Sequence, residues 1–187
     1  MKLLPRVAVA AGVVLLAAGM SRAQTNAAAP GDVSEYRLKA VFLYNFAKFA
    51  DWPDGTLGEP GEPIVVGVYD AKPFEGAFGD LEGKRAKGRP LILLEGQTFS
   101  ELEGCHIVFL NAPDDLLIKS LLQRLRSRPV LTVGERTGFC RWGGIVNFSM
   151  QEGRVRLQVN RVAAEKAGLQ LSAQLLEVSE LVDKGDD

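Results

Sequence analysis

The stretch Ile64–Tyr69 constrains the fold most, because it is an almost unbroken apolar run rich in β-branched residues. A strand without apolar–polar alternation is buried on both faces, and such strands belong to parallel sheets flanked by helices. Short apolar runs at Leu91–Leu94, Ile107–Leu110 and Val130–Val133 predict three further strands. A helix is expected between the last two, from Asp114 to Arg126, with one side formed by Leu116, Leu117, Leu121, Leu122 and Leu125. Strands that alternate with helices in this way indicate α/β layers.

The segment upstream of these strands has the period of a helix. Apolar residues at helical spacing predict a helix over Val33–Ala50. It ends before Trp52-Pro53, because the residue that precedes a proline is disfavoured in the α region. A second, short helix is expected over Phe74–Leu81.

Downstream of Gly143-Gly144 the pattern changes to apolar–polar alternation. The segments Ile145–Met150 and Val155–Val159 therefore predict a hairpin with one more exposed face. Asn160 can cap a helix that runs to Ala167, and Ser172 can cap a last helix over Ala173–Val182. The expected fold class is α/β: a single domain with a mixed, mostly parallel sheet, helices on both faces, and a C-terminal hairpin plus helices.

The first residues have the three parts of a signal peptide. Lys2 and Arg6 precede an apolar stretch from Val7 to Ala18, and Ser21 and Ala23 occupy the positions that signal peptidase reads. The apolar stretch is shorter than the roughly 20 residues that a membrane-spanning helix requires. We therefore expect export to the periplasm and removal of this segment.

The rest of the chain is expected to form a leader, one domain and a short tail. After the signal peptide of residues 1–23, the Ala-rich residues 24–31 are expected to form a flexible leader. Residues 32–182 are expected to form one α/β domain, and residues 183–187 a disordered tail. The formal net charge of −1 becomes more negative when the basic signal peptide is removed, so a nucleic-acid surface is not indicated.

Motifs of catalytic or cofactor chemistry are missing from the sequence. There is no Gly-x-Gly-x-x-Gly after a strand and no Gly-x-Ser-x-Gly elbow, which argues against dinucleotide and hydrolase sites. The single histidine, His106, is interpreted as a hydrogen-bonded structural residue rather than a general base or a metal ligand. No spaced His/Cys set is present, so we expect no metal, no cofactor and no enzymatic activity.

The two cysteines, Cys105 and Cys140, can either form one bridge or remain two separate thiols. Cys105 enters the expected strand Ile107–Leu110, and Cys140 follows the exit of Val130–Val133. If these strands are parallel neighbours, about 3.3 Å per residue places the cysteines roughly 13 to 17 Å apart. A disulfide needs Cα atoms within about 7 Å, so we predict that Cys105 and Cys140 are unpaired.

A set of segments that covers nearly the whole mature domain carries a resemblance to a known family. The segments begin in the first helix with its Trp-Pro exit, and they are Glu35–Phe49 with Trp52-Pro53, Gly104–Phe109, Arg128–Val133, Gly143–Phe148, Arg154–Asn160 and Ala167–Leu176. In their order and spacing they resemble the YfiR-like periplasmic proteins.

The resemblance implies a function in signalling. It implies a non-enzymatic periplasmic protein that binds the periplasmic domain of an inner-membrane diguanylate cyclase and inhibits it. It also implies that an OmpA-like outer-membrane lipoprotein can sequester this protein, with cyclic-di-GMP and biofilm formation as the output. A homodimer is left open, and so is a second interpretation as a periplasmic small-molecule sensor or solute-binding module.

The cysteines depart from the family pattern. Better-studied members form two bridges, with cysteines in the first strand and just after the position of Cys140. Here Ile64–Val68 contains no cysteine, and Asn147 stands where another is expected. The resemblance therefore implies that Cys105 and Cys140 both lack their usual partners.

Aromatic and arginine side chains are the expected binding residues, because these types are enriched at protein interfaces. They lie on the first helix and its exit, in the loop before Gly143-Gly144, and around the hairpin. The candidates for partner or ligand binding are Tyr44, Trp52, Arg141, Trp142, Arg154, Arg156 and Arg161. A deep polar pocket near Trp52 or Trp142 would favour the sensor interpretation.

The signal peptide generates the first testable prediction. The mature protein should begin at Gln24, because Ser21 and Ala23 direct cleavage after Ala23. Intact-mass measurement of the protein from the periplasmic fraction checks this. Recovery of the full-length chain from the cytosol would contradict it.

Overall fold

The computed structural model describes residues 30–74, 76–81 and 83–182. The expected signal peptide, most of the expected leader and the expected tail lie outside these residues. The helices are α1 (Pro30–Phe49), α2 (Asp115–Leu125), α3 (Arg161–Lys166) and α4 (Ala173–Glu177). The strands are β1 (Ala50–Asp51), β2 (Ile64–Tyr69), β3 (Arg85–Ala86), β4 (Arg89–Gly96), β5 (Ile107–Leu110), β6 (Leu131–Gly134), β7 (Val146–Gln151), β8 (Arg154–Val159), β9 (Gln170–Leu171) and β10 (Ser179–Leu181).

The main sheet has eight strands in the order β10-β8-β7-β6-β5-β2-β4-β3. Strands β4, β2, β5, β6 and β7 run parallel to one another, whereas β8 is antiparallel to β7 and β3 is antiparallel to β4. Strand β10 pairs parallel with β8 at one edge, and β1 and β9 form a separate two-stranded sheet. The expected α/β fold with a mixed, mostly parallel sheet is confirmed.

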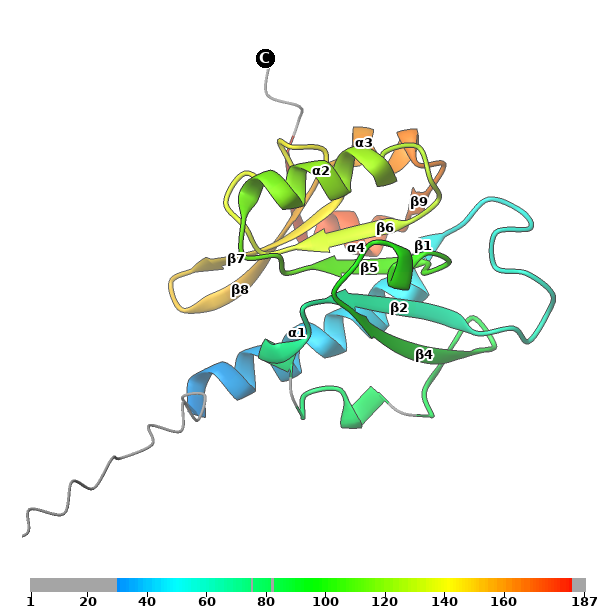
Figure 1. Cartoon of the computed structure of the whole chain (residues 1–187), viewed down its shortest axis with the longest axis horizontal. Helices are drawn as coiled ribbons and strands as arrows, with labels where there is room; N and C mark the ends of the chain where they lie inside the picture. The colour runs from blue at the N-terminus through cyan, green and yellow to red at the C-terminus, as the bar shows by residue number, and fades with distance from the viewer. Residues whose placement is uncertain (1–29, 75, 82, 183–187) are drawn as a thin grey trace, which may run out of the picture.

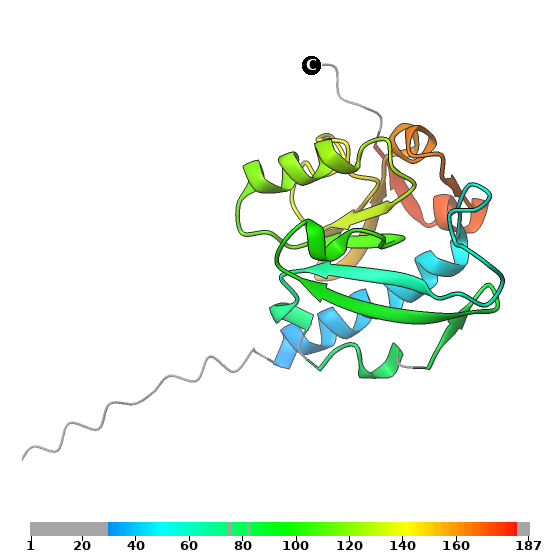
Figure 2. The ribbon, with the colours of Figure 1, turned by 45° about the vertical axis from the view of Figure 1, so that its right-hand side comes forward.

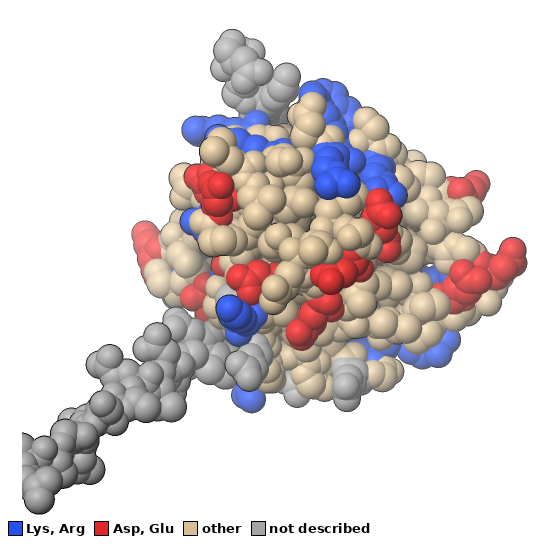
Figure 3. All heavy atoms as spheres, viewed as in Figure 1, with Lys and Arg blue, Asp and Glu red and all other residues tan. Residues whose placement is uncertain are grey.

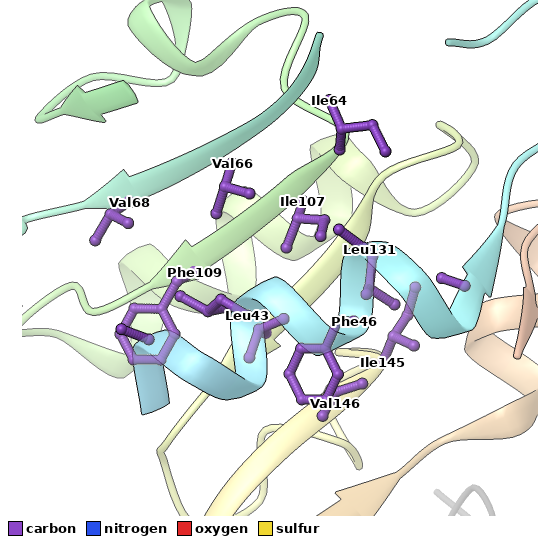
Figure 4. Close-up of a cluster of buried hydrophobic side chains, with 14 of the residues drawn as sticks. Leu43, Phe46, Ile64, Val66, Val68, Ile107, Phe109, Leu131, Ile145 and Val146 are labelled. Carbon is purple, nitrogen blue, oxygen red and sulfur yellow. The ribbon is translucent and has the colours of Figure 1, made fainter. Parts of the chain in front are cut away.

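Helix α1 lies across one face of the sheet, as Figure 1 shows. Its side chains Leu43 and Phe46 are fully buried, and Figure 4 shows them directed toward the strands. Phe46 stacks on Phe148 of β7 with 5.9 Å between ring centroids. Burying a Leu or Phe side chain contributes roughly 1.5 to 3 kcal/mol, so this layer is the main source of stability on that face.

Helix α2 covers the opposite face over β5 and β6, and Figure 2 shows the sheet lying between α1 and α2. Asp114 caps the helix by accepting a hydrogen bond from the backbone N–H of Leu116 at 3.0 Å. Alternate residues of β5 pack on opposite faces of the sheet, one in the layer of α1 and the next in the layer of α2. Ile107 packs in the α1 layer, and Val108 packs in the α2 layer. This two-sided burial explains why β5 has no polar position.

Strands β7 and β8 form the expected hairpin. Its turn places Glu152 at φ 50° and Gly153 at φ 71°. Two consecutive positive φ values are the geometry of a type I′ turn, whose twist matches the flanking strands. Asn160 caps α3 as expected, because its side chain accepts a hydrogen bond from the N–H of Ala163 at 2.8 Å.

The structure corrects three expectations. The segment Phe74–Leu81 is not one helix: the chain forms two 3₁₀ turns, Lys72–Phe74 and Gly79–Leu81, separated by Gly76 at φ 75°. The helix expected over Ala173–Val182 ends at Glu177, and β10 follows because the open edge of β8 accepts it.

The third correction concerns α2. Its leucine-rich face was expected to include Leu116, which is 72% exposed in the structure. The buried residues are Ile118, Leu121, Leu122 and Leu125, so the buried face of α2 begins after its first turn.

The loop between β6 and β7 is held by one aromatic ring. Phe139 is fully buried, and its ring lies between Gly134 and Gly144, where a Cβ atom at either glycine would overlap ring carbons. The N–H of Gly144 also donates a hydrogen bond to the backbone oxygen of Phe139 at 3.0 Å. This packing fixes the position of the residues that follow, Cys140 to Gly143.

The ring contact generates the second prediction. Gly144→Ala should reduce the free energy of unfolding by about 1 to 3 kcal/mol, because the added methyl group overpacks the core against Phe139. Gly79→Ala is the matched control, since a Cβ there has no neighbour within 4 Å. Urea denaturation measures both variants. Equal stability of Gly144→Ala and the wild type would show that the ring is not confined there.

Candidate functional site

A large cavity opens where β7 extends beyond β6. The two strands pair at Val133 with Val146 and at Gly134 with Asn147, so the rest of β7 has no neighbour on that side among the described strands. A cleft of about 1220 Å³ lies there, which we call the β6–β7 cleft. Asn111 after β5 and Glu135 after β6 line it, so it lies at the carboxyl ends of parallel strands. Ligands of open α/β sheets bind in crevices at this end.

One wall of the β6–β7 cleft is a buried charge cluster. The ammonium group of Lys39, on a side chain that is 4% exposed, lies 2.5 Å from Glu35 Oε1 and 2.5 Å from Glu135 Oε2. The hydroxyl of Tyr36 donates a hydrogen bond to Glu135 Oε1 at 2.8 Å. Removing one member of a buried ion pair typically costs about 3 to 5 kcal/mol, because the other charge is left uncompensated. The cluster ties the start of α1 to the end of β6.

The other wall is a row of polar side chains on β7, β8 and β10. Asn147 Nδ2 donates to Gln158 Oε1 at 3.2 Å, and the amide groups of Gln158 and Gln151 both donate to Glu180 Oε2, at 3.3 and 3.4 Å. Asn147 Oδ1 and Ser149 Oγ are buried and have no hydrogen-bond partner among the described residues. Since buried polar atoms are normally paired, this wall offers groups that a polar ligand can satisfy.

A second, smaller cavity of about 330 Å³ lies beside Trp142. It is enclosed by one face of α2, the loop of Arg141 to Gly143, and α3. We call it the basic pocket, because it is lined by Lys119, Arg126, Arg141 and Lys166. Arg141 also lines the β6–β7 cleft, so the two cavities are neighbours.

The two aromatic candidates on α1 and its exit lie away from both cavities. Tyr44 is half-buried, and its hydroxyl donates to the backbone oxygen of Arg85 at 3.2 Å, which holds β3 against α1. Trp52 is half-buried and packs edge-on against His106, with 6.4 Å between ring centroids. Trp52 Nε1 is buried and has no hydrogen-bond partner among the described residues.

The arginine candidates are also dispersed. Arg154 and Arg156 are exposed on β8. Arg161 is exposed at the start of α3 and pairs with Glu165, with 3.2 Å between Nε and Oε1. Of the seven candidates, the structure therefore brings together only Arg141 and Trp142 at one cavity.

Most of the residues that line the two cavities were not predicted from the sequence. The Lys39–Glu135 pair joins residues far apart in the chain, and only the Glu35/Lys39 spacing of four was visible as a helical ion pair. Lys119 and Arg126 are seven residues apart, which places them on one face of α2. That spacing could have predicted that Lys119 and Arg126 lie together. The position of Lys166 beside them depends on how α3 packs, which the sequence does not show.

The cysteines are free and buried. Burial raises the pKa of Cys105 to about 11 and that of Cys140 to about 12, so both thiols are protonated at neutral pH. A protonated, buried thiol is a poor nucleophile and a poor metal ligand. Among the residues that the structure describes, no three His, Cys, Asp or Glu side chains form a group that could hold a metal ion.

Both ring nitrogens of His106 contact the backbone, which is the arrangement of a structural histidine. Its Nδ1 accepts a hydrogen bond from the N–H of Val65 at 3.0 Å, and Nε2 lies 3.3 Å from the backbone oxygen of Thr56. These contacts assign the neutral tautomer with the proton on Nε2. Burial lowers the pKa of His106, and the charge of Arg89 lowers it further, against the opposing effect of the Thr56 contact.

The sequence matches a known protein family described as YfiR/HmsC-like, over residues 36–180. No curated protein sequence matches the chain significantly. A crystal structure of a conserved domain protein from Vibrio cholerae O1 biovar El Tor is similar, with a TM-score of 0.49 and 12% sequence identity. The similarity covers 80% of this chain and 60% of that one.

His106 generates the third prediction. Its pKa in the folded protein lies below the ordinary value of 6.5, so the unfolded chain binds the proton more readily. The contribution of neutral His106 to the stability of the folded protein is therefore complete above about pH 6.5. It is lost as the pH falls toward and through the pKa of His106 in the folded protein. The free energy of unfolding from urea denaturation should decrease between pH 7.5 and pH 5.5.

The matched variant is His106→Asn, which keeps an acceptor for the Val65 N–H but does not titrate in this range. It should show a flatter pH dependence than the wild type. The same dependence of the unfolding free energy on pH in the two proteins would contradict the assignment of this dependence to His106.

Proposed function

Because the chain belongs to the YfiR/HmsC-like family, we propose that it is a periplasmic regulator that binds and inhibits an inner-membrane diguanylate cyclase. The family match confirms the resemblance seen in the sequence motifs. The family is regulatory and periplasmic, and it is known in cyclic-di-GMP regulation. The match over residues 36–180 is the observation that carries the proposal.

The proposed role is non-enzymatic. The contacts of His106 and Lys39 and the protonation of the two thiols support this. Both nitrogens of His106 contact the backbone, and burial raises the pKa of both thiols. Lys39 is engaged in ion pairs with both Glu35 and Glu135. In the part of the chain that the structure describes, no helix is long and apolar enough to cross a membrane.

The proposed docking surface is the β6–β7 cleft together with the β7–β8 hairpin. At its rim, Met150 is 53% exposed and Leu181 is 52% exposed, and Arg154 and Arg156 lie on the neighbouring strand. Apolar side chains, Met and Arg are common at protein interfaces, where the charged residues form the rim. The periplasmic domain of the cyclase would cover this surface, and an OmpA-like outer-membrane lipoprotein would compete for the protein.

A second candidate function is a periplasmic small-molecule sensor or solute-binding module. The observation that favours it is the basic pocket beside Trp142. Its volume of about 330 Å³ is near the lower end of the range for small-molecule sites, which is about 300 to 1000 Å³. A sensor of this kind need not contact a cyclase at all.

The fourth prediction is that the mature protein captures a diguanylate cyclase from its own cell envelope. After in-cell cross-linking and affinity purification, the cyclase should be enriched with the wild-type protein. Arg154→Glu/Arg156→Glu should reduce its recovery at least tenfold, because the variant reverses two exposed charges at the proposed rim.

The matched control is Lys48→Glu/Lys84→Glu, which reverses two exposed charges beside Tyr44, away from the hairpin. It should capture the cyclase as the wild type does. Capture of no cyclase by the wild type would contradict the proposed function and favour the sensor. An equal loss of cyclase recovery in the two variants would contradict the proposed docking surface.

A further inference from the structure

The basic pocket is not explained by the proposed docking of a cyclase. It lies where α2, α3 and the loop of Arg141 to Gly143 meet, and it shares Arg141 with the lining of the β6–β7 cleft. Figure 3 shows basic atoms gathered over the part of the molecule where Figure 1 places α2 and α3, with acidic atoms mostly below them.

The charges of the pocket are unbalanced. Lys119, Arg126, Arg141 and Lys166 line it, and none of its described lining residues is acidic. None of these four side chains has a carboxylate within 4.0 Å among the residues that the structure describes. By contrast, the neighbouring Arg128 and Arg161 pair with Glu103 and Glu165. Like charges in one concavity repel one another and focus a positive potential that attracts anions.

The pocket is held in place by packed elements. Lys119, Leu122 and Gln123 of α2 and its C-cap residue Arg126 follow the spacing of a single helix face, on which Leu122 is buried. The ammonium group of Lys119 lies 4.5 Å from the centroid of the Trp142 ring. This cation–π contact places Lys119 against the loop that carries Arg141.

Asn160 joins the loop to α3. Its Nδ2 donates to the backbone oxygen of Cys140 at 2.8 Å, and its Oδ1 accepts from the N–H of Ala163 at 2.8 Å. The loop is held from the other side by the Phe139 ring between two glycines. The backbone that carries Arg141 is thus fixed before any ligand arrives, which lowers the entropic cost of binding.

We propose that the basic pocket binds a small phosphate-bearing ligand. A phosphate carries up to two negative charges, which match four unpaired cations better than the single charge of a carboxylate does. Guanidinium groups bind phosphate oxygens through two parallel hydrogen bonds, and Arg126 and Arg141 supply two such groups. The cavity of about 330 Å³ admits a phosphate with a small organic substituent.

The phosphate group can belong to a soluble molecule or to the headgroup of an anionic phospholipid. Binding to the pocket is measured without a cyclase, so the proposed site stands or falls separately from the proposed function. Inorganic pyrophosphate serves as the soluble probe, and phosphatidylglycerol vesicles serve as the lipid probe.

The fifth prediction compares the mature wild-type protein with two double variants by isothermal titration calorimetry and vesicle co-sedimentation. Arg126→Gln/Arg141→Gln removes two charges of the pocket, and Lys48→Gln/Lys84→Gln removes two charges elsewhere. Arg126→Gln/Arg141→Gln should weaken pyrophosphate binding at least tenfold, and the control should change it less than twofold. Thermal unfolding without ligand verifies that both variants fold.

Each outcome decides the proposal. Pyrophosphate binding that depends on Arg126 and Arg141 supports the site with a soluble ligand. Binding to vesicles alone, with the same dependence, supports the site with a lipid headgroup as the source of the phosphate. Absence of binding to both probes, or equal weakening in the two double variants, overturns the proposal.

Discussion

The packing of α1 across the sheet is the interaction on which the rest of the structure depends. Leu43, Phe46 and Ala47 are fully buried, and they join strands from both halves of the sheet into one core. The same helix places Lys39 beside Glu135, at the end of β6. Its C-terminal end continues into β1, whose pairing with β9 holds the chain that leads from α3 to α4. The cleft and the C-terminal elements therefore both depend on this one helix.

Burial on two faces made the central strands predictable from sequence. The bounds of β2 and β5 agree with the expected runs Ile64–Tyr69 and Ile107–Leu110, because a strand inside two layers has no polar position to obscure the pattern. The short edge strand β10 was not predictable, because the segment Ser179–Leu181 carries little β signal of its own. It forms a strand because β8 presents an open edge, which is a tertiary effect.

The candidate site was predictable only where its residues are close in sequence. Arg141 and Trp142 are adjacent and do line one cavity, whereas Tyr44 and Trp52 support the fold around β3 and His106. The other cations of the basic pocket come from α2 and α3, which meet only after the chain has folded. Arg141 lines both the cleft and the pocket, so a ligand in the pocket and a partner in the cleft would share one side chain.

The proposed regulation is tested most directly by the cellular concentration of cyclic-di-GMP. The measurement compares the parent strain, a strain from which the gene is deleted, and the deletion strain that carries the wild-type gene. An inhibitor of a diguanylate cyclase predicts a higher cyclic-di-GMP concentration after deletion and a return to the parental value when the gene is restored. An unchanged concentration in the deletion strain would contradict it.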